Sequence, residues 1–246
     1  MPSEQETIEQ LTFWEHFGVL RRYILFGGIV FFVIAIILFA YAGTILTRYL
    51  LAPLHGQPLV FLTPAGPFFF EMRIAFVGAA AVCFPLWLFL ASRFGGSALP
   101  RRKRRGFLWF AFAAAALGAG SIVLSLRYLV PASFNVFSHY LVPGTAFMLT
   151  ADGYVSFVFL VTTVCFVVVE LPVVIVALAY AHVVDPYWLA THRRYLYVGL
   201  LILLGVILPT TDVVTLLAVT VPALLFTEVG LVVAKRVYIQ KEVPLD

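Results

Sequence analysis

The sequence predicts an all-α membrane protein with six transmembrane helices and a single domain that covers residues 1–246. The first observation is composition: 63% of the residues are hydrophobic and only 11% are charged, whereas soluble domains contain about 25% charged residues. The second is pattern, because apolar runs recur along the whole chain and most approach the roughly 20 residues that a helical span needs. Short connections between the runs leave no room for a separate soluble domain.

The predicted spans begin after a cytoplasmic N-terminal segment, residues 1–23. Paired arginines, Arg21 and Arg22, precede the first apolar run and look superficially like an export signal. The run is longer than the apolar region of a signal, however, and no small-residue cleavage site follows it. We therefore expect a first membrane anchor. The six spans are predicted at about 24–46, 70–92, 107–130, 154–183, 195–208 and 213–234.

The predicted connections are polar, basic or rich in proline. The first loop contains Pro53, Pro58, Pro64 and Pro67. The second is the basic segment 93–105, and further loops are expected around residues 131–152 and 185–194. A turn at residues 209–212 joins the last two spans.

Basic residues predict the orientation of these spans, because cytoplasmic loops carry an excess of Lys and Arg. Thirteen of the sixteen Lys and Arg residues fall on the side that holds both termini and the 93–105 loop. Arg48, Arg73 and Arg127 fall on the other side. Both termini are therefore predicted to be cytoplasmic.

The last two spans are short. Residues 195–208 would form about 21 Å of helix, against a hydrocarbon core of about 30 Å. Glu228 interrupts the sixth run after Val213–Thr227. A short hairpin must thin the bilayer or be shielded by longer neighbours, and length alone leaves both possibilities open.

Glu170 is the candidate functional residue inside the membrane. It lies near the middle of an apolar run with no basic residue to pair with, and Pro172 follows two positions later. A carboxylate at bilayer depth costs about 2.5–3.5 kcal/mol on insertion scales, and a proline within a helix removes a backbone hydrogen bond. Such a pair normally faces the protein interior or a wet cavity.

Other residues argue against catalysis. Cys83 and Cys165 fall inside apolar runs and are expected to be small core residues. The sequence shows no metal-ligand spacing, nucleophile–base pair or phosphate-binding loop, so we expect neither an enzyme nor a cofactor. The net charge of +4 is interpreted from the location of the basic residues relative to the membrane and does not indicate nucleic-acid binding.

Several motifs follow one another along the predicted spans. The strongest are the segment Tyr154–Phe157 leading to Glu170-Leu171-Pro172-Val173, and Asp212 followed by Pro222 and Glu228. Weaker ones are Ala52-Pro53-Leu54, Pro67-Phe68-Phe69, Pro85, Phe94, Tyr128 and Pro131. In this order and spacing, the motifs resemble the TatC family, the polytopic subunit of the twin-arginine protein translocase. The resemblance covers nearly the whole chain.

The resemblance implies a curved, glove-shaped helical bundle in the plasma membrane of a prokaryote. It implies binding of twin-arginine signal peptides of folded cargo, partnership with single-span TatA/TatB-type subunits, homo-oligomers within a larger complex, contact with lipids, and energy from the proton gradient. The predicted signal-binding residues are His16, Arg21 and Phe94, together with Glu15 and Lys103, which concern the departures from the family described next. The implied intramembrane or partner-contact residues are Glu170, Pro172, Asp212, Thr215 and Glu228, and the implied structural positions in and around the loops are Pro53, Phe68, Pro85 and Tyr154.

The sequence departs from the family at both carboxylates that usually bind the arginine pair. The entry-helix motif has Val19 in place of its glutamate, and the second loop has Lys103 before Arg104-Arg105. Since guanidinium groups are recognised by carboxylates, a substitute is needed. Glu15 lies one helical turn before Val19, and with Glu4, Glu6 and Glu9 it forms an acidic N-terminal tail. This tail could supply the acidic surface, or it could be a solvated leader.

Other roles stay open at this level. Glu170 could be satisfied by a partner's polar side chain, be protonated at rest, or be hydrogen-bonded to a neighbouring helix. Asp212 could cap the sixth helix, and Glu228 could pair with Lys235 or Arg236. The basic run at 101–105 could set topology or contact anionic lipids. Rival interpretations are a divergent TatC paralogue with an accessory receptor role, or a proton-coupled small-solute transporter, although no internal repeat supports the transporter.

Overall fold

The computed structural model describes residues 13–54, 57–97, 101–138, 148–208 and 213–239. Within these ranges the chain is helical, which confirms the predicted all-α class, and the β-pairing is a single isolated bridge between Val60 and Thr150. The helices are α1 (Phe13–Ile37), α2 (Gly43–Leu51), α3 (Gly66–Ser97), α4 (Arg101–Leu124), α5 (Val130–Ser138), α6 (Ala151–Tyr180), α7 (Pro186–Thr191), α8 (Arg193–Ile207) and α9 (Val213–Ile239). A π-helical turn follows α1 (Leu38–Ala42), another follows α4 (Ser125–Leu129), and a 3₁₀ turn follows α2 (Ala52–Leu54).

Four helical stretches are long and apolar enough to cross a membrane: Gly18–Tyr41, Gly66–Phe94, Gly106–Val136 and Ala151–Tyr180. They correspond to the first four predicted spans. The remaining two, α8 and α9, form the predicted hairpin. Because α8 has 15 residues, it is about 22 Å long and shorter than the hydrocarbon core, as expected.

Several predicted boundaries are wrong. The loop expected at 131–152 contains α5 and the first turn of α6, since Pro131 lies in the first turn of α5, where a proline is tolerated. The helix α6 ends at Tyr180 rather than at residue 183, and His182 beyond it has a φ of 57°. Glu228 interrupts the apolar run of the sixth predicted span, and α9 continues through it to Ile239.

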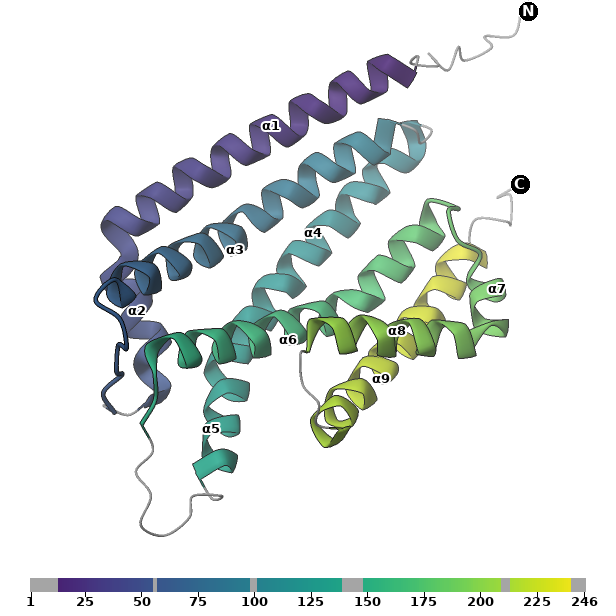
Figure 1. The fold of residues 1–246 in the computed structure, drawn as a ribbon. Coiled ribbons are helices and arrows are strands. Elements are labelled where there is room, and N and C mark those ends of the chain that lie inside the picture. The colour runs from purple at the N-terminus through teal and green to yellow at the C-terminus, as the bar shows by residue number, and fades with distance from the viewer. Residues whose placement is uncertain (1–12, 55–56, 98–100, 139–147, 209–212, 240–246) are drawn as a thin grey trace, which may run out of the picture.

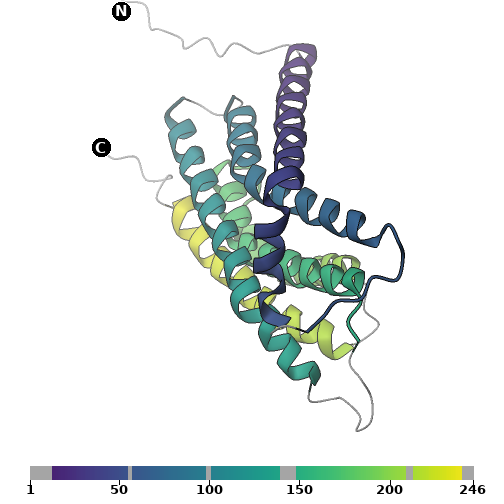
Figure 2. The ribbon, with the colours of Figure 1, turned by 90° about the vertical axis from the view of Figure 1, so that its left-hand side faces the viewer.

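The spans form a curved layer rather than a closed bundle (Figures 1 and 2). Going through the layer, α1 packs on α3, α3 on α4, α4 on α6 and α6 on α9, while α8 packs against α9. The start of α1, the end of α3, the start of α4 and the end of α9 gather together on one side of the molecule, with α7 (Figure 1). We call this side the basic end, because most of the arginines and lysines predicted to be cytoplasmic lie in these segments.

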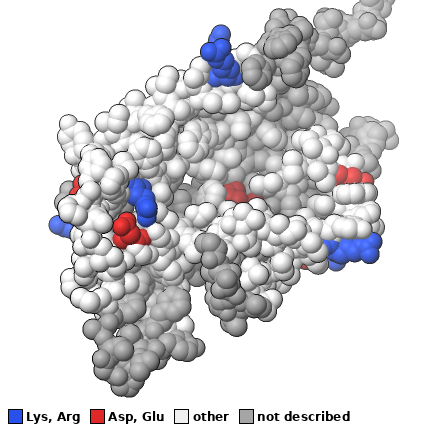
Figure 3. All heavy atoms as spheres, in the orientation of Figure 1, with Lys and Arg blue, Asp and Glu red and all other residues white. Residues whose placement is uncertain are grey.

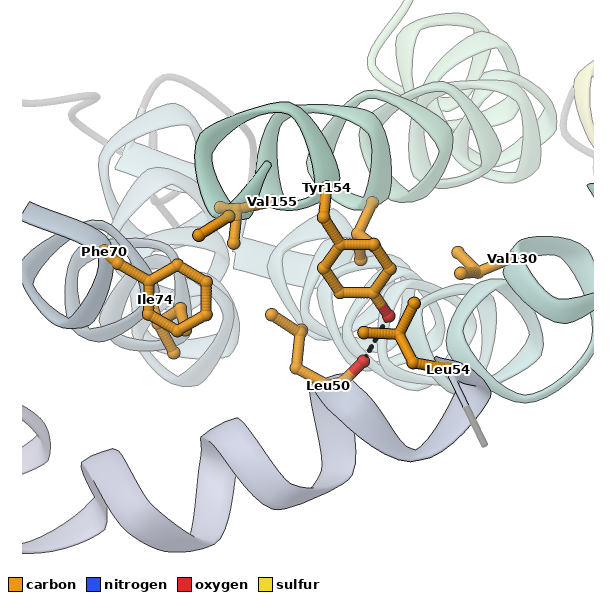
Figure 4. Close-up of a cluster of buried hydrophobic side chains, with 9 residues drawn as sticks. Leu50, Leu54, Phe70, Ile74, Val130, Tyr154 and Val155 are labelled. Atoms are coloured by element: carbon orange, nitrogen blue, oxygen red, sulfur yellow. Dashed lines mark hydrogen bonds between the residues drawn. The ribbon is translucent and has the colours of Figure 1, made fainter. Parts of the chain in front are cut away.

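The opposite side, which we call the cap end, holds the largest cluster of buried apolar side chains among the described residues. These side chains come from α2, the 3₁₀ turn after it, α3, α5 and α6, and the ring of Tyr154 lies among them (Figure 4). The hydroxyl of Tyr154 donates a hydrogen bond to the carbonyl oxygen of Leu50. Two backbone hydrogen bonds, each 3.0 Å long, join the segment before α3 to the start of α6. The amide of Val60 donates to the carbonyl of Leu149, and the amide of Ala151 donates to the carbonyl of Val60. The cap therefore ties together segments that are distant in the sequence.

Candidate functional site

The face of the curved layer seen in Figure 1 is hollowed near its centre, and an acidic side chain is visible in the hollow (Figure 3). The functional residues predicted from the sequence fall into three groups: the buried carboxylate of α6, the contact between α8 and α9, and the basic end of α1 and α3.

Glu170 is the buried carboxylate. Only 7% of its surface is exposed, and its Oε1 atom has no hydrogen-bond partner among the described residues. No ion pair to Glu170 is present in the part of the chain that the structure describes. A buried unpartnered carboxyl oxygen costs free energy, so the fold does not need this oxygen for its own stability. Of the three roles left open by the sequence, the hydrogen bond to a neighbouring helix is not found for Oε1.

Gly118 of α4 creates the space that Glu170 occupies. A Cβ atom placed on Gly118 would lie 2.9 Å from Glu170 Oε1 and 2.8 Å from the rings of both Phe84 and Phe166. These two rings meet edge to face with centroids 4.7 Å apart. Any side chain at position 118 would therefore displace the carboxylate or the aromatic pair beside it.

The seam between α4 and α6 continues from Gly118 toward the cap end through small polar residues. Ser121 donates a 2.7 Å hydrogen bond to the carbonyl of Gly118, and Ser125 lies 3.0 Å from Thr162 through their hydroxyl oxygens. Cys165 directs its thiol at the carbonyl of Ser121, at 3.6 Å. Each of these groups has a partner within the seam, in contrast to Glu170.

Pro172 lies inside α6 and faces α9. A Cβ atom on Gly230 would lie 2.8 Å from the Cα of Pro172, so the two backbones approach closely at this point. The proline contributes no amide hydrogen, and the close contact with α9 buries the segment just beyond Glu170.

Glu228 is held by α8. The ion pair that the sequence left open for it is present, but the partner is Arg193 rather than Lys235 or Arg236. The hydroxyl of Tyr197 donates to Glu228 Oε1, and Arg193 Nη2 lies 3.5 Å from Oε2. Lys235 instead places its ammonium group 5.6 Å from the centroid of the Tyr187 ring. The carboxylate thus joins the two helices of the hairpin, which explains why α9 continues through it.

At the basic end, Arg21 is exposed and Phe94 is half-buried. Phe94 lines a groove of about 470 Å³ between α1 and α3, together with Leu20, Tyr23, Ile24, Gly27, Gly28, Trp87, Leu90 and Ala91. Val19, the position that lacks the usual carboxylate, is half-buried and directly precedes Leu20 of this groove. Glu15 and His16 lie in the first turn of α1, and Lys103 lies in the first turn of α4. The side chains of these three residues fall outside the described ones.

The remaining predicted residues that the structure describes lie in helices or turns, away from Glu170 in the sequence. Pro53 lies in the 3₁₀ turn after α2, and Pro85 lies inside α3. Phe68 lies in the first turn of α3, with its ring 5.6 Å from those of Phe39 and Phe69. Asp212 and its predicted cap fall outside the described residues, as does the side chain of Thr215.

Sequence reasoning missed several residues of these sites. Gly118 looks like any glycine in an apolar run, and nothing in the sequence connects it with Glu170, 52 positions away. Tyr197 and Arg193 could have been proposed as partners of Glu228 from the predicted hairpin alone. Arg73, which donates a 3.0 Å hydrogen bond to Ser156 and lies 3.9 Å from Asp152, joins α3 to α6 at the cap end.

Comparison with known proteins identifies the fold and the family. The family model described as "Sec-independent protein translocase protein (TatC)" matches residues 15–222. A TatC protein of Koribacter versatilis is 26% identical over 95% of this chain and 89% of its own length. One from Aquifex aeolicus is 28% identical, with 90% and 93% covered.

A solved structure described as the twin-arginine translocase receptor TatC superposes with a TM-score of 0.77 at 23% identity, over 89% of this chain and 99% of that one. The predicted resemblance is therefore confirmed, and the architecture is the six-helix TatC fold rather than that of a transporter. The family is a component of a protein translocase and is not enzymatic. This chain is a multi-pass membrane protein that belongs to the TatC family of Sec-independent protein translocases.

Proposed function

We propose that this protein is the receptor subunit of a twin-arginine translocase, which binds the signal peptides of folded proteins at its basic end. The observation that carries the proposal is the combination of family membership with a buried, unpartnered carboxylate in α6. A carboxylate that the fold leaves unsatisfied is available to a second molecule. The protein would lie in the plasma membrane of a prokaryote, with both termini cytoplasmic.

The partner at Glu170 is proposed to be a single-span subunit with a polar side chain at membrane depth. A hydroxyl or amide donor from such a helix would satisfy Oε1, and the gain would be larger than at a hydrated surface because the alternative is an orphaned oxygen. The seam residues around Glu170 support this choice, since Ser121, Ser125 and Thr162 already have partners. Binding would therefore depend on Glu170 more than on its hydroxyl neighbours.

Signal recognition must differ from the usual arrangement, because Val19 and Lys103 replace both carboxylates. We propose that Glu15, in the first turn of α1, supplies the acidic contact, with the acidic residues before it. The start of α1 supports this, since Glu15 and Val19 are four positions apart in a continuous helix and so share a face. Arg21, His16 and Phe94 would complete the surface, and Lys103 would lie at its rim.

The test is site-specific photo-crosslinking of a twin-arginine signal peptide to membranes that contain this protein, with probes at Glu15, Val19 and Lys103. A crosslink that is lost when the arginine pair becomes a lysine pair supports a receptor with a relocated acidic surface. No crosslink, in membranes where a conventional TatC gives one, would indicate a paralogue whose substrate enters by another route. Normal export by a Glu15→Ala variant would remove Glu15 from the mechanism while leaving the receptor role in place.

A further inference from the structure

A column of stacked side chains projects from the basic end where α7 meets α8. The rings of Trp188 and His192 lie 4.5 Å apart and nearly parallel, at 26°. The ring of Tyr195 continues the column 6.0 Å from His192, again at 26°. The guanidinium carbon of Arg194 lies 4.8 Å from the Tyr195 ring centroid. We call these four residues the aromatic stack.

Local backbone geometry holds the aromatic stack in place. Asp185 caps α7 by accepting a 2.8 Å hydrogen bond from the amide of Tyr187, with Pro186 in the first position of the helix. At the junction with α8, the Nδ1 atom of His192 lies 2.9 Å from the carbonyl oxygen of Trp188. The stack is therefore ordered without being buried: Trp188 is 57% exposed and Tyr195 is 61% exposed.

The stack also carries a cation that no described carboxylate neutralises. Arg194 donates a 3.1 Å hydrogen bond to the hydroxyl of Tyr195, and among the described residues it forms no ion pair. Its neighbour Arg193 differs, because it pairs with Glu228. The acidic residue nearest to Arg194 in the sequence, Asp185, accepts the capping hydrogen bond of α7. Arg194 is thus oriented by an aromatic ring and free to bind an anion.

The surroundings of the stack indicate which anion. Tyr195, Val198 and Ile202 recur at helical spacing along α8, and the last two are 58% and 60% exposed. The cation therefore lies at the end of an apolar stripe that begins a membrane span. Aromatic rings are typical of the membrane–water interface, and juxtamembrane arginines attract anionic lipid headgroups. A lipid matches both parts, whereas an acidic peptide would match only the charge.

We propose that the aromatic stack is a docking site for an anionic phospholipid, separate from the signal-binding surface and from Glu170. Arg194 binds the headgroup phosphate, the Trp188 and Tyr195 rings lie at the level of the glycerol, and one acyl chain follows Val198 and Ile202. This inference does not depend on the proposed receptor function.

The test uses the full-length protein in nanodiscs of phosphatidylcholine with a fixed minor fraction of phosphatidylglycerol. In separate samples, one lipid or the other carries bromine atoms near the headgroup, which quench tryptophan fluorescence. The fluorescence of Trp188 is obtained by subtracting the signal of Trp188→Phe from that of the wild type, which removes the contribution of the other tryptophans. We expect brominated phosphatidylglycerol to quench Trp188 as strongly as if its local fraction were about five times its fraction in the whole nanodisc. This is the enrichment expected from one juxtamembrane arginine.

Three variants separate a site from a general charge effect. Arg194→Gln should reduce quenching to parity with phosphatidylcholine, and Arg194→Lys should retain most of the enrichment. Arg93→Gln is the matched control, because Arg93 also stacks on a ring, that of Phe89 at 5.1 Å, at the same end of the molecule. Absence of enrichment in the wild type, or an equal loss in Arg93→Gln and Arg194→Gln, would overturn the proposal. Because Arg194 is exposed, none of these variants is expected to impair folding.

Discussion

Tyr154 and Glu170 are buried polar side chains on the same helix, α6, but they relate to the fold in opposite ways. Tyr154 is 1% exposed, its hydroxyl donates to the carbonyl oxygen of Leu50, and apolar side chains from four other helical segments surround it. Glu170 is nearly as buried, yet its Oε1 atom has no partner among the described residues. The first arrangement is typical of a group that stabilises the structure, and the second of a group kept for another molecule. Changes at the two positions should therefore separate stability from transport.

The largest expected effect is on stability at the cap end. Tyr154→Ala should lower the free energy of unfolding by about 3–5 kcal/mol, because it removes a large core side chain and leaves a cavity. Tyr154→Phe should cost about 1 kcal/mol, the net value of one hydrogen bond. Denaturant unfolding in detergent micelles measures both. Export per folded molecule should be unchanged in Tyr154→Phe, and a specific transport defect there would contradict the structural role.

Glu170→Ala should have the reverse profile. Export of a twin-arginine reporter should fall at least about tenfold, equivalent to about 1.4 kcal/mol, because a partner loses its polar contact. The free energy of unfolding should not decrease, because the substitution removes a buried carboxyl group whose Oε1 atom makes no hydrogen bond within the fold. Glu71→Ala, an exposed carboxylate of α3, is the control. If Glu170→Ala unfolded like Tyr154→Ala, the distinction between the two residues would collapse.

Gly118→Ala tests whether the space around Glu170 matters in addition to its charge. The new Cβ would press on Glu170, Phe84 and Phe166, and such overpacking typically costs about 1–3 kcal/mol. Export should fall as the carboxylate moves, even though Glu170 itself is intact. Gly120→Ala is the matched control, since a Cβ there meets nothing within 4 Å. Equal behaviour of the two glycine variants would show that the position of the carboxylate is not controlled by α4.

The smallest expected effect concerns the contact between α8 and α9. Tyr197→Phe removes one of the two partners of Glu228 and should lower stability by about 1 kcal/mol or less, because the site is partly exposed and Arg193 remains. The double variant with Arg193→Gln should lose more than Tyr197→Phe alone. Unfolding measurements on the single and double variants check this. A transport defect without any change in stability would contradict the structural role and indicate that Glu228, like Glu170, acts in transport.

Much of this molecule follows from the sequence. Composition and the spacing of apolar runs predict the class, the spans and the short hairpin, and the isolated position of Glu170 predicts a buried polar site. The boundaries were less predictable. Thr150 caps α6 by accepting a hydrogen bond from Gly153, a local signal that would have placed the start of the helix at Ala151. Pro131 indicated a loop, although a proline in a first helical turn is also compatible with α5.

Contacts between helices that are distant in the sequence were not predictable, because one sequence gives no information on which helix faces which. The contact of Arg193 and Tyr197 with Glu228 is an exception, because the short turn of the predicted hairpin brings the two helices together. The role of Gly118, in contrast, depends on how α4 and α6 cross. For the same reason, Glu170 could be recognised from the sequence as unusual but not as unsatisfied.

The bond from Tyr154 to Leu50 has a consequence for how the protein is made. The two residues are 104 positions apart, so at typical synthesis rates the ribosome needs roughly 5–20 s to supply the second after the first. Until α6 has entered the membrane, the 50–54 segment lacks the tyrosine that fills its core. The cap end therefore closes late in biogenesis, after the first three spans have been synthesised.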